Sequence, residues 1–222
     1  MKKLGIIGGA GPLASALLYE TIIRESLKYG DPCPEIFLIN YPFTRGLTLA
    51  EAQANGGLLQ QELNHCIEQL MEQGAEIGIL ACNTMHRYLI DTDTLPFISI
   101  PSLILQKALE KKHHRLQILG TQSTRESALY EHPQIEVSYP SADKQKILDH
   151  VINRILDGTF SSKDSGFIEK IISDQEETDG VVLGCSDLPV LHHHFPINSK
   201  VPLYDSIKLS AKTIYQTLRG TP

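Results

Sequence analysis

Residues 76–86 read EIGILACNTMH, and residues 180–189 read GVVLGCSDLP. In each stretch an apolar, partly β-branched run ends at a cysteine, Cys82 or Cys185, and two polar residues follow at once. A short apolar run of this kind predicts a strand that is buried on both faces. Because Asn and Ser favour the start of a helix, each cysteine is expected where the carboxyl end of a strand meets a helix.

Six further apolar runs have the same character, and helix-forming segments separate them. The predicted strands cover residues 3–8, 35–40, 76–81, 96–100, 115–120, 135–140, 180–185 and 200–205, and long helices are predicted over residues 12–29, 57–73, 141–158 and 206–218. Strands that alternate with helices of this length form right-handed βαβ units around a parallel sheet. The predicted fold class is therefore α/β.

The two halves of the chain repeat one another in order. LGIIGG near Gly8 matches LQILGT near Gly120, GILACNT at Cys82 matches VVLGCSD at Cys185, and LPFISIPS at Pro96 matches VPLYDSI at Pro202. These matches predict two pseudo-symmetric α/β subdomains, each with a mainly parallel sheet, and an active site in the cleft between them. The first subdomain is expected to cover residues 1–100 plus 206–222, and the second residues 101–205.

Bulk composition excludes several classes of function. The chain of 222 residues has 41% hydrophobic and 21% charged residues, which is ordinary for a globular protein. A net charge of -6 and a pI near 5.8 disfavour nucleic-acid and membrane partners. Four cysteines without a C-x-x-C pair predict neither a disulfide framework nor a zinc site. We expect a cytoplasmic protein with reduced thiols and no metal, in which residues 192–194, HHH, lie in a loop.

A glycine-rich loop follows the first predicted strand. Residues 9–14, GAGPLA, fit the loose G-x-G-x-x-A form of a dinucleotide fingerprint, but the second strand ends in Asn40 instead of the acidic residue that binds ribose. Pro12 suits the first position of the next helix, whose free N–H groups attract anions. The loop favours a small anion such as a carboxylate, and a dinucleotide or a purely structural turn are the alternatives.

Cys82 and Cys185 differ from ordinary packed cysteines by their position. Ligands bind at the carboxyl ends of strands in open α/β sheets, and a helix N-terminus lowers the pKa of a thiol. Asn83 and Ser186 are expected to cap these helices, and Thr84 adds a hydroxyl.

Two thiols that face each other over a small anion suit one reaction in particular. A thiolate removes a proton from a carbon, and the opposite thiol returns a proton to the other face, which inverts that carbon. Thiols with near-neutral pKa values suit such an acid–base pair. Backbone N–H groups and hydroxyls around the carboxylate would stabilise the carbanion, so no cofactor is needed.

Three stretches carry a family resemblance: GIIGGAGPLAS at residues 5–15, ACNTMH at residues 81–86 and VVLGCSDLP at residues 181–189. Together they resemble the signatures of the cofactor-independent aspartate/glutamate racemase family, within the Asp/Glu/hydantoin racemase superfamily. The resemblance implies two similar α/β subdomains, an active site between them, a homodimer, and isomerisation of a small amino acid without a cofactor.

The resemblance also assigns roles to residues. It places the catalytic bases on Cys82 and Cys185. It places substrate-binding positions on Ala10, Arg45, Gln53, Asn83, Thr84, Met85, Thr121 and Ser186, and supporting positions on His86 and Asp187. His86 either orients the first thiol or closes the helix start, and Asp187 either caps its helix or acts in catalysis.

Departures from the family pattern bear on the substrate. Ala10 stands where the family commonly has Met, and Ser-Asp follows the second cysteine where Thr-Glu is common. Arg45 follows the second strand at a shorter spacing than in strict aspartate racemases, and Leu156 and Asp157 stand where those enzymes carry a Lys late in the central helix.

Together with Gln53, these departures favour the broader-specificity amino-acid racemase branch, with an acidic amino acid as the expected substrate. Three alternatives remain open: a sister lyase or isomerase acting on a small carboxylate, a dinucleotide-dependent oxidoreductase, which Asn40 disfavours, and a non-catalytic amino-acid-binding protein. Decarboxylating relatives tend to keep only one of the two cysteines, and a binding protein would need neither.

Overall fold

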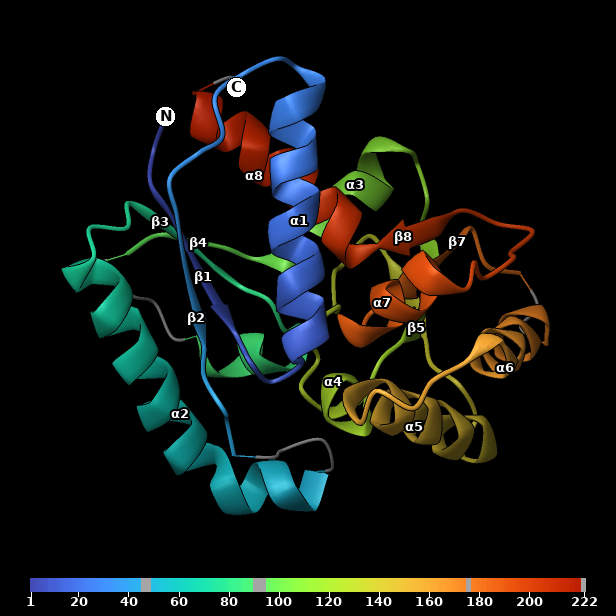
Figure 1. The fold of residues 1–222 in the computed structure, drawn as a ribbon. Coiled ribbons are helices and arrows are strands. Elements are labelled where there is room, and N and C mark those ends of the chain that lie inside the picture. Colours follow the sequence, from blue (N-terminus) through green and yellow to red (C-terminus); the bar gives the residue numbers. More distant parts are fainter. Residues whose placement is uncertain (45–48, 90–94, 175–176, 221–222) are drawn as a thin grey trace.

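Two four-stranded parallel sheets with the same strand order organise the chain (Figure 1). The computed structural model describes residues 1–44, 49–89, 95–174 and 177–220, without the side chains of residues 49–53. Sheet A has the order β2-β1-β3-β4 and sheet B has the order β6-β5-β7-β8. The repeated order confirms the α/β class and the two pseudo-symmetric sheets, and a strand forms in each of the predicted regions.

The elements follow one another in the alternation that the sequence predicts. The first part of the chain forms β1 (Leu4–Gly8), α1 (Pro12–Lys28), β2 (Ile36–Asn40), α2 (Leu49–Glu72), β3 (Ile77–Leu80), the 3₁₀ helix η1 (Thr84–Tyr88), β4 (Phe97–Ile98) and α3 (Ile100–Glu110). The second part forms β5 (Arg115–Leu119), α4 (Gln122–Glu126), β6 (Glu136–Ser138), α5 (Ala142–Leu156), α6 (Ser162–Ser173), β7 (Gly180–Leu183), α7 (Asp187–His194), β8 (Leu203–Asp205) and α8 (Ser206–Arg219).

The central strands are apolar throughout because both of their faces are covered. β1 and β3 are buried along their whole length, and successive residues of β1 enter different cores. Ile6 belongs to the larger core, which continues through α1, α3 and α8 into the helices of sheet B. Ile7 belongs to a smaller core beneath α2, which lies on the far side of sheet A from α1 in Figure 1.

The last helix returns to the first part of the chain. α8 packs along α1, and the ends of the two helices are joined by aromatic and ionic contacts. Tyr29 and Tyr215 stack with ring centroids 5.3 Å apart, and the Arg219 guanidinium lies over both rings. Asp31 accepts a hydrogen bond from the Tyr215 hydroxyl and lies 3.0 Å from Nε of Arg219. These contacts hold the two sheets on either side of α1 and α8.

Two local expectations were wrong. Residues 192–194 form the last turn of α7, because the buried Leu188 and Leu191 anchor a helix there, and Nδ1 of His192 accepts a bond from the Ile197 N–H at 3.0 Å. α2 begins at residue 49 instead of 57. Glycine disfavours helix interiors by about 1 kcal/mol, so the Gly56-Gly57 pair predicts a later start. The described residues of α2 that pack beneath sheet A, from Leu59 to Leu70, all follow this pair, and the earlier turns extend the helix that this packing stabilises.

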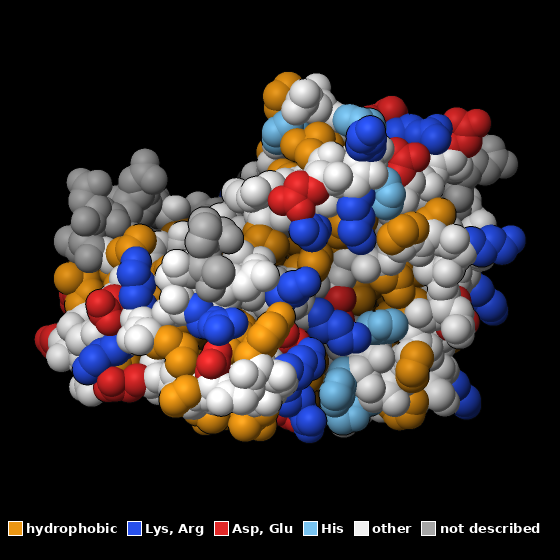
Figure 2. Space-filling model, turned by 90° about the horizontal axis from the view of Figure 1, so that it is seen from above, with side chains coloured by type: hydrophobic (Ala, Val, Ile, Leu, Met, Phe, Trp, Pro, Cys, Tyr) orange, Lys and Arg blue, Asp and Glu red, His pale blue; other side chains and the backbone are white. Residues whose placement is uncertain are grey.

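The surface carries mixed charges. On the face drawn in Figure 2, basic side chains are interspersed with acidic and apolar ones, which differs from a stripe of one sign. Over the described part of the chain, each helix is too short or too polar to cross a bilayer.

Gly9 provides a test of the turn between β1 and α1. Its φ is +111°, and a Cβ added there would lie 1.9 Å from the Tyr41 carbonyl oxygen. We expect Gly9→Ala to lower the free energy of unfolding by about 3 kcal/mol, measured by urea denaturation. Gly30→Ala is the matched control, because Gly30 also has positive φ but faces open space. The control should cost about 1 kcal/mol, and equal losses in both variants would contradict the steric role of the Tyr41 carbonyl.

Candidate active site

One cleft of about 310 Å³ collects residues that follow the strands of both sheets. It is lined by Gly9, Ala10, Pro12, Pro42, Phe43, Thr44, Cys82, Thr84, Met85, Tyr88, Thr121, Leu156, Cys185 and Asp187. Segments after β1, β2, β3, β5 and β7 all contribute, so the carboxyl edges of the two sheets meet here. The two predicted thiols therefore face a single cavity.

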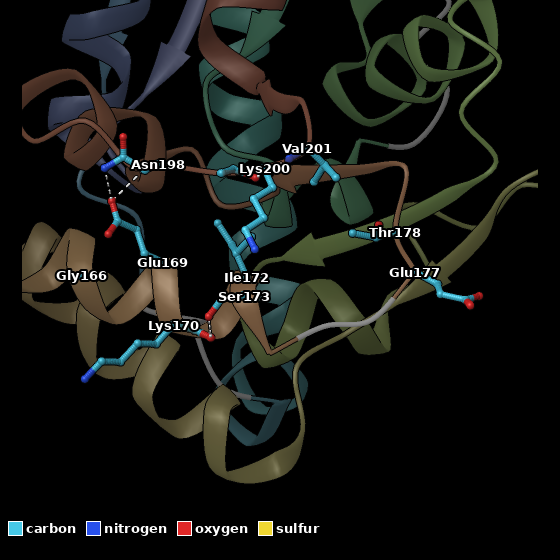
Figure 3. Close-up of a pocket in the computed structure, with 11 residues that line it drawn as sticks. Gly166, Glu169, Lys170, Ile172, Ser173, Glu177, Thr178, Asn198, Lys200 and Val201 are labelled. Carbon is cyan, nitrogen blue, oxygen red and sulfur yellow. Dashed lines mark hydrogen bonds between the residues drawn. The ribbon is translucent and has the colours of Figure 1, made fainter.

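A larger hollow of about 790 Å³ lies at the opposite edge of sheet B, between the end of α6 and the segments that enter β7 and β8 (Figure 3). Its polar contacts are internal: Glu169 Oε1 accepts bonds from the backbone N–H and the side-chain amide of Asn198 at 2.8 and 2.7 Å. None of the predicted site residues lines it. The smaller cleft is the candidate active site because both thiols lie there.

Cys82 lies where β3 ends and η1 begins. The preceding residue is fixed to sheet A, because the Ala81 N–H donates to the Ile7 carbonyl at 2.8 Å. The first N–H groups of η1, from Thr84 and Met85, point at the Cys82 sulfur and lower the pKa of its thiol. Cys82 is partly exposed at the cleft, but other atoms pack closely around its sulfur. This burial raises the pKa of the thiol to about 12, because it outweighs the lowering by the two N–H groups.

The hydrogen bond of His86 to Cys82 is made to the backbone carbonyl and not to the sulfur. Nε2 of His86 accepts a bond from the Ile100 N–H at 3.3 Å, so Nδ1 carries the proton and donates it to the Cys82 carbonyl at 2.8 Å. Burial lowers the pKa of His86, which keeps the ring neutral. Of the two expected roles, the structure supports closure of the helix start, here by joining η1 to α3.

Cys185 has a different partner. The Leu119 carbonyl accepts bonds from the N–H groups of Gly184 and Cys185, which holds the end of β7 against β5. The thiol donates to Oδ2 of Asp187 at 3.5 Å, and the Asp187 N–H also points at the sulfur. Burial and the nearby carboxylate raise the pKa of Cys185 well above its ordinary value, more than the N–H lowers it.

Asp187 joins the second half of the chain to the glycine loop of the first. Burial raises the pKa of its carboxyl to about 7, against a smaller lowering by the Cys185 hydrogen bond. A Cβ added at Gly11 would lie 2.4 Å from Oδ1 of Asp187, so a larger residue there would force the carboxylate to shift. Oδ1 is buried and has no hydrogen-bond partner among the described residues.

Two expectations about this site were wrong. The thiols do not have near-neutral pKa values in this state, because desolvation exceeds the helix-terminus effect at both cysteines. Asn83 and Ser186 have helical backbone angles and their side chains cap nothing. Both side chains are instead buried, and the Asn83 amide and the Ser186 hydroxyl have no hydrogen-bond partner within the described ranges. Buried polar groups in this condition are available to a ligand.

Three hydroxyls join the two halves beside the thiols. Thr84 Oγ1 lies 3.2 Å from Thr121 Oγ1 and 2.9 Å from Thr124 Oγ1, and the last two are 3.1 Å apart. Thr121 also caps α4 by accepting from the Thr124 N–H. η1 of the first half is thereby fixed to α4 of the second. Thr124 was missed by the sequence prediction, because its position becomes relevant only once α4 is known to meet η1.

The structure brings most predicted site residues together. The cleft lining includes Ala10, Cys82, Thr84, Met85, Thr121, Cys185 and Asp187, whereas Asn83, Ser186 and His86 lie behind it. Arg45 lies outside the described residues, and Gln53 lies in α2 with its side chain undescribed.

A further part of the lining was not predicted. Pro42, Phe43 and Thr44 follow the carboxyl end of β2, where ligands bind in parallel sheets, so that rule applied to β2 would have found them. Tyr88 lies one 3₁₀ turn after Met85 and shares its side of η1, and both line the cleft.

Comparison with known proteins identifies one family model and several solved structures that match this chain. The family model described as Asp/Glu/Hydantoin racemase matches residues 7–214. Solved structures with the same fold include an aspartate racemase from Picrophilus torridus, with 21% identity, coverage of 99% of this chain and 95% of that one, and a TM-score of 0.75. An aspartate racemase homologue from Pyrococcus horikoshii has 23% identity and a TM-score of 0.73, and the match covers 99% of this chain and 100% of that one. A glutamate racemase isoform from Bacillus anthracis has 19% identity and a TM-score of 0.69, and the match covers 99% of this chain and 82% of that one.

The raised pKa of Asp187 predicts a pH-dependent stability. Between pH 4 and pH 7 the native carboxyl keeps a proton that the unfolded chain has released, so its contribution to stability falls as pH rises. Asp187→Asn removes this dependence. We expect the variant to gain up to about 4 kcal/mol relative to the unmodified protein between pH 4.5 and pH 8, measured by urea denaturation. A difference that does not change with pH would show that the native carboxyl titrates as it does in the unfolded chain.

Proposed function

We propose that this chain, which belongs to the Asp/Glu/hydantoin racemase family, interconverts the L and D forms of an amino acid by a two-base proton transfer without a cofactor. Its family gives a racemase kind of function. The observation that carries the mechanism is the placement of Cys82 and Cys185, at equivalent strand ends of two matching sheets, on one small cleft. Aspartate, glutamate and related amino acids are the first candidates, and we extend the proposal to a cytoplasmic homodimer on the sequence resemblance.

The proton transfer balances with the groups present. One cysteine, as thiolate, removes the Cα proton, and the electron pair of the broken C–H bond passes into the substrate carboxylate. The other cysteine, as thiol, gives its proton to the opposite face of Cα and becomes a thiolate. The product is the opposite enantiomer, and the reverse reaction exchanges the two roles.

The cleft offers a partner for each charged group of an amino acid. Thr84 and Thr121 hydroxyls line it, and the unpartnered Asn83 amide lies directly behind. These donors suit the α-carboxylate and the negative charge that it gains as the proton leaves. Oδ1 of Asp187 is a free acceptor that suits the α-ammonium group.

Asp187 also provides a route to the thiolate that the reaction requires. The Cys185 thiol already donates to Oδ2 at 3.5 Å, so its proton has a short path to a carboxylate whose pKa is raised to about 7. On the Cys82 side, the N–H groups of Thr84 and Met85 stabilise a thiolate by direct hydrogen bonding.

Exchange of the Cα proton is the direct test. Incubation with single enantiomers of an amino-acid panel in deuterated water, followed by NMR, should show deuterium at Cα in the inverted product without any added cofactor. The solvent proton enters because each thiol equilibrates with water between turnovers. Absence of Cα exchange with every amino acid tested would overturn the racemase proposal.

The two thiols can be tested separately. Cys82→Ser and Cys185→Ser should each lower kcat for racemisation roughly 100- to 10,000-fold, because a serine hydroxyl is a far weaker acid and base at neutral pH. Cys33→Ser is the control, since Cys33 is exposed and lies outside the cleft.

The same variants separate the rival functions. If one of the two Cys→Ser variants keeps full Cα-exchange activity, a lyase or isomerase that uses a single thiol is favoured. Unchanged ligand binding in both variants, together with no exchange in the unmodified protein, would favour an amino-acid-binding protein. Equally mild losses in both variants would assign the cysteines to packing.

A further inference from the structure

The lining of the cleft contains two chemical kinds of side chain. The two thiols, the Thr44, Thr84 and Thr121 hydroxyls and Asp187 are polar, whereas Ala10 and Pro12 beside the glycine loop are small and apolar. The larger apolar or aromatic lining side chains, here called the apolar end, are Pro42 and Phe43 after β2, Met85 and Tyr88 on η1, and Leu156 at the end of α5. Phe43, Met85 and Tyr88 belong to or pack against the core beneath α2, and Leu156 packs against the larger core, so this wall is supported from behind.

Within the described residues, the charged side chains that line or adjoin this cleft are carboxylates. Among its described lining residues, Asp187 carries a carboxyl group and no side chain carries a positive charge. A second carboxylate lies just behind the apolar end, where Glu62 of α2 accepts bonds from the Thr44 hydroxyl and N–H at 2.9 and 3.1 Å. Glu62 thereby fixes the loop after β2 and adds negative potential beside it.

We propose that the apolar end binds the substrate's side chain, and that this side chain is uncharged and largely apolar, of the size of methionine or norleucine. The inference rests on the proposed racemase function and replaces its first candidates, aspartate and glutamate, by uncharged amino acids. It replaces the expectation of an acidic substrate, which came from the family resemblance.

The physical reason is desolvation. A side-chain carboxylate placed against Phe43, Met85 and Leu156 would lose its water and gain no counter-charge from the described lining, while the nearby Glu62 carboxylate repels it. An apolar side chain in the same place buries its own surface and that of the wall, which is favourable in proportion to the area.

Leu156 is the side chain whose identity should decide the preference. It is half-buried at the last residue of α5, so it enters the cleft from the second half of the chain, opposite the wall that the first half provides. An amine placed there would supply the counter-charge that an acidic substrate needs.

The test compares kcat/KM for Cα exchange across norleucine, methionine, glutamine, glutamate, aspartate and lysine. For the unmodified protein we expect norleucine and methionine to exceed glutamate and aspartate by at least about 10-fold. Leu156→Lys should reduce that ratio by about 10-fold, mainly through KM for the acids, and Leu156→Met should keep the original order of preference. Circular dichroism of both variants confirms that the fold is retained.

Several outcomes would overturn the inference. It fails when glutamate, aspartate or lysine is the best substrate of the unmodified protein. If the protein strongly prefers glutamate or aspartate and Arg45→Ala abolishes that preference, Arg45 binds the substrate's side chain and the apolar end does not. If no amino acid exchanges its proton, the racemase function fails, and calorimetric titration still decides the subsite. Binding of norleucine above glutamate supports the apolar end, and the reverse order refutes it.

Discussion

The two halves of the molecule meet at the cleft where Gly11, in the loop after β1, lies against Asp187 at the start of α7. A Cβ at position 11 would fall 2.4 Å from Oδ1 of Asp187, so any other residue there would require the buried carboxylate to shift. The remaining geometry comes from α1 and α8, which share one apolar core with the helices of sheet B. With the sheets fixed in this way, their carboxyl edges enclose a cleft just large enough for a small molecule.

The same close packing controls the electrostatics of the site. Excluding water raises the pKa of both thiols and of Asp187, and the N–H groups of the two helix starts oppose this only in part. Unpartnered buried groups such as the Asn83 amide and the Ser186 hydroxyl cost about 1–3 kcal/mol each. Buried polar groups without a hydrogen-bond partner are usually found at sites that a ligand completes, and these two residues adjoin the two thiols.

The sequence predicted the architecture well because its signals are local. Apolar runs located every strand, and the repeated Cys-containing stretches predicted that Cys82 and Cys185 would meet. What it missed depends on long-range contacts. The early turns of α2 extend a helix that packs on sheet A further along, and the helical HHH segment follows from the buried face of α7. The caps expected of Asn83 and Ser186, and the thiol pKa values, failed because motif logic omits the burial that the other half of the chain imposes.

The two halves match in fold but differ in chemistry. Two residues after the thiol, the first half has Thr84, held by two other threonine hydroxyls, and the second has Asp187, which accepts a hydrogen bond from the Cys185 thiol. The two thiols therefore have different surroundings. In the proposed two-base reaction both directions pass through the same intermediate, but the L and D enantiomers bind forms of the protein that differ in which thiol carries the proton. Enantiomers have equal free energies in achiral solvent, so the equilibrium constant of a racemisation is unity and kcat/KM must be the same in both directions. The asymmetry between Thr84 and Asp187 can then appear only in the separate values of kcat and KM, where a difference in one must be matched by the other.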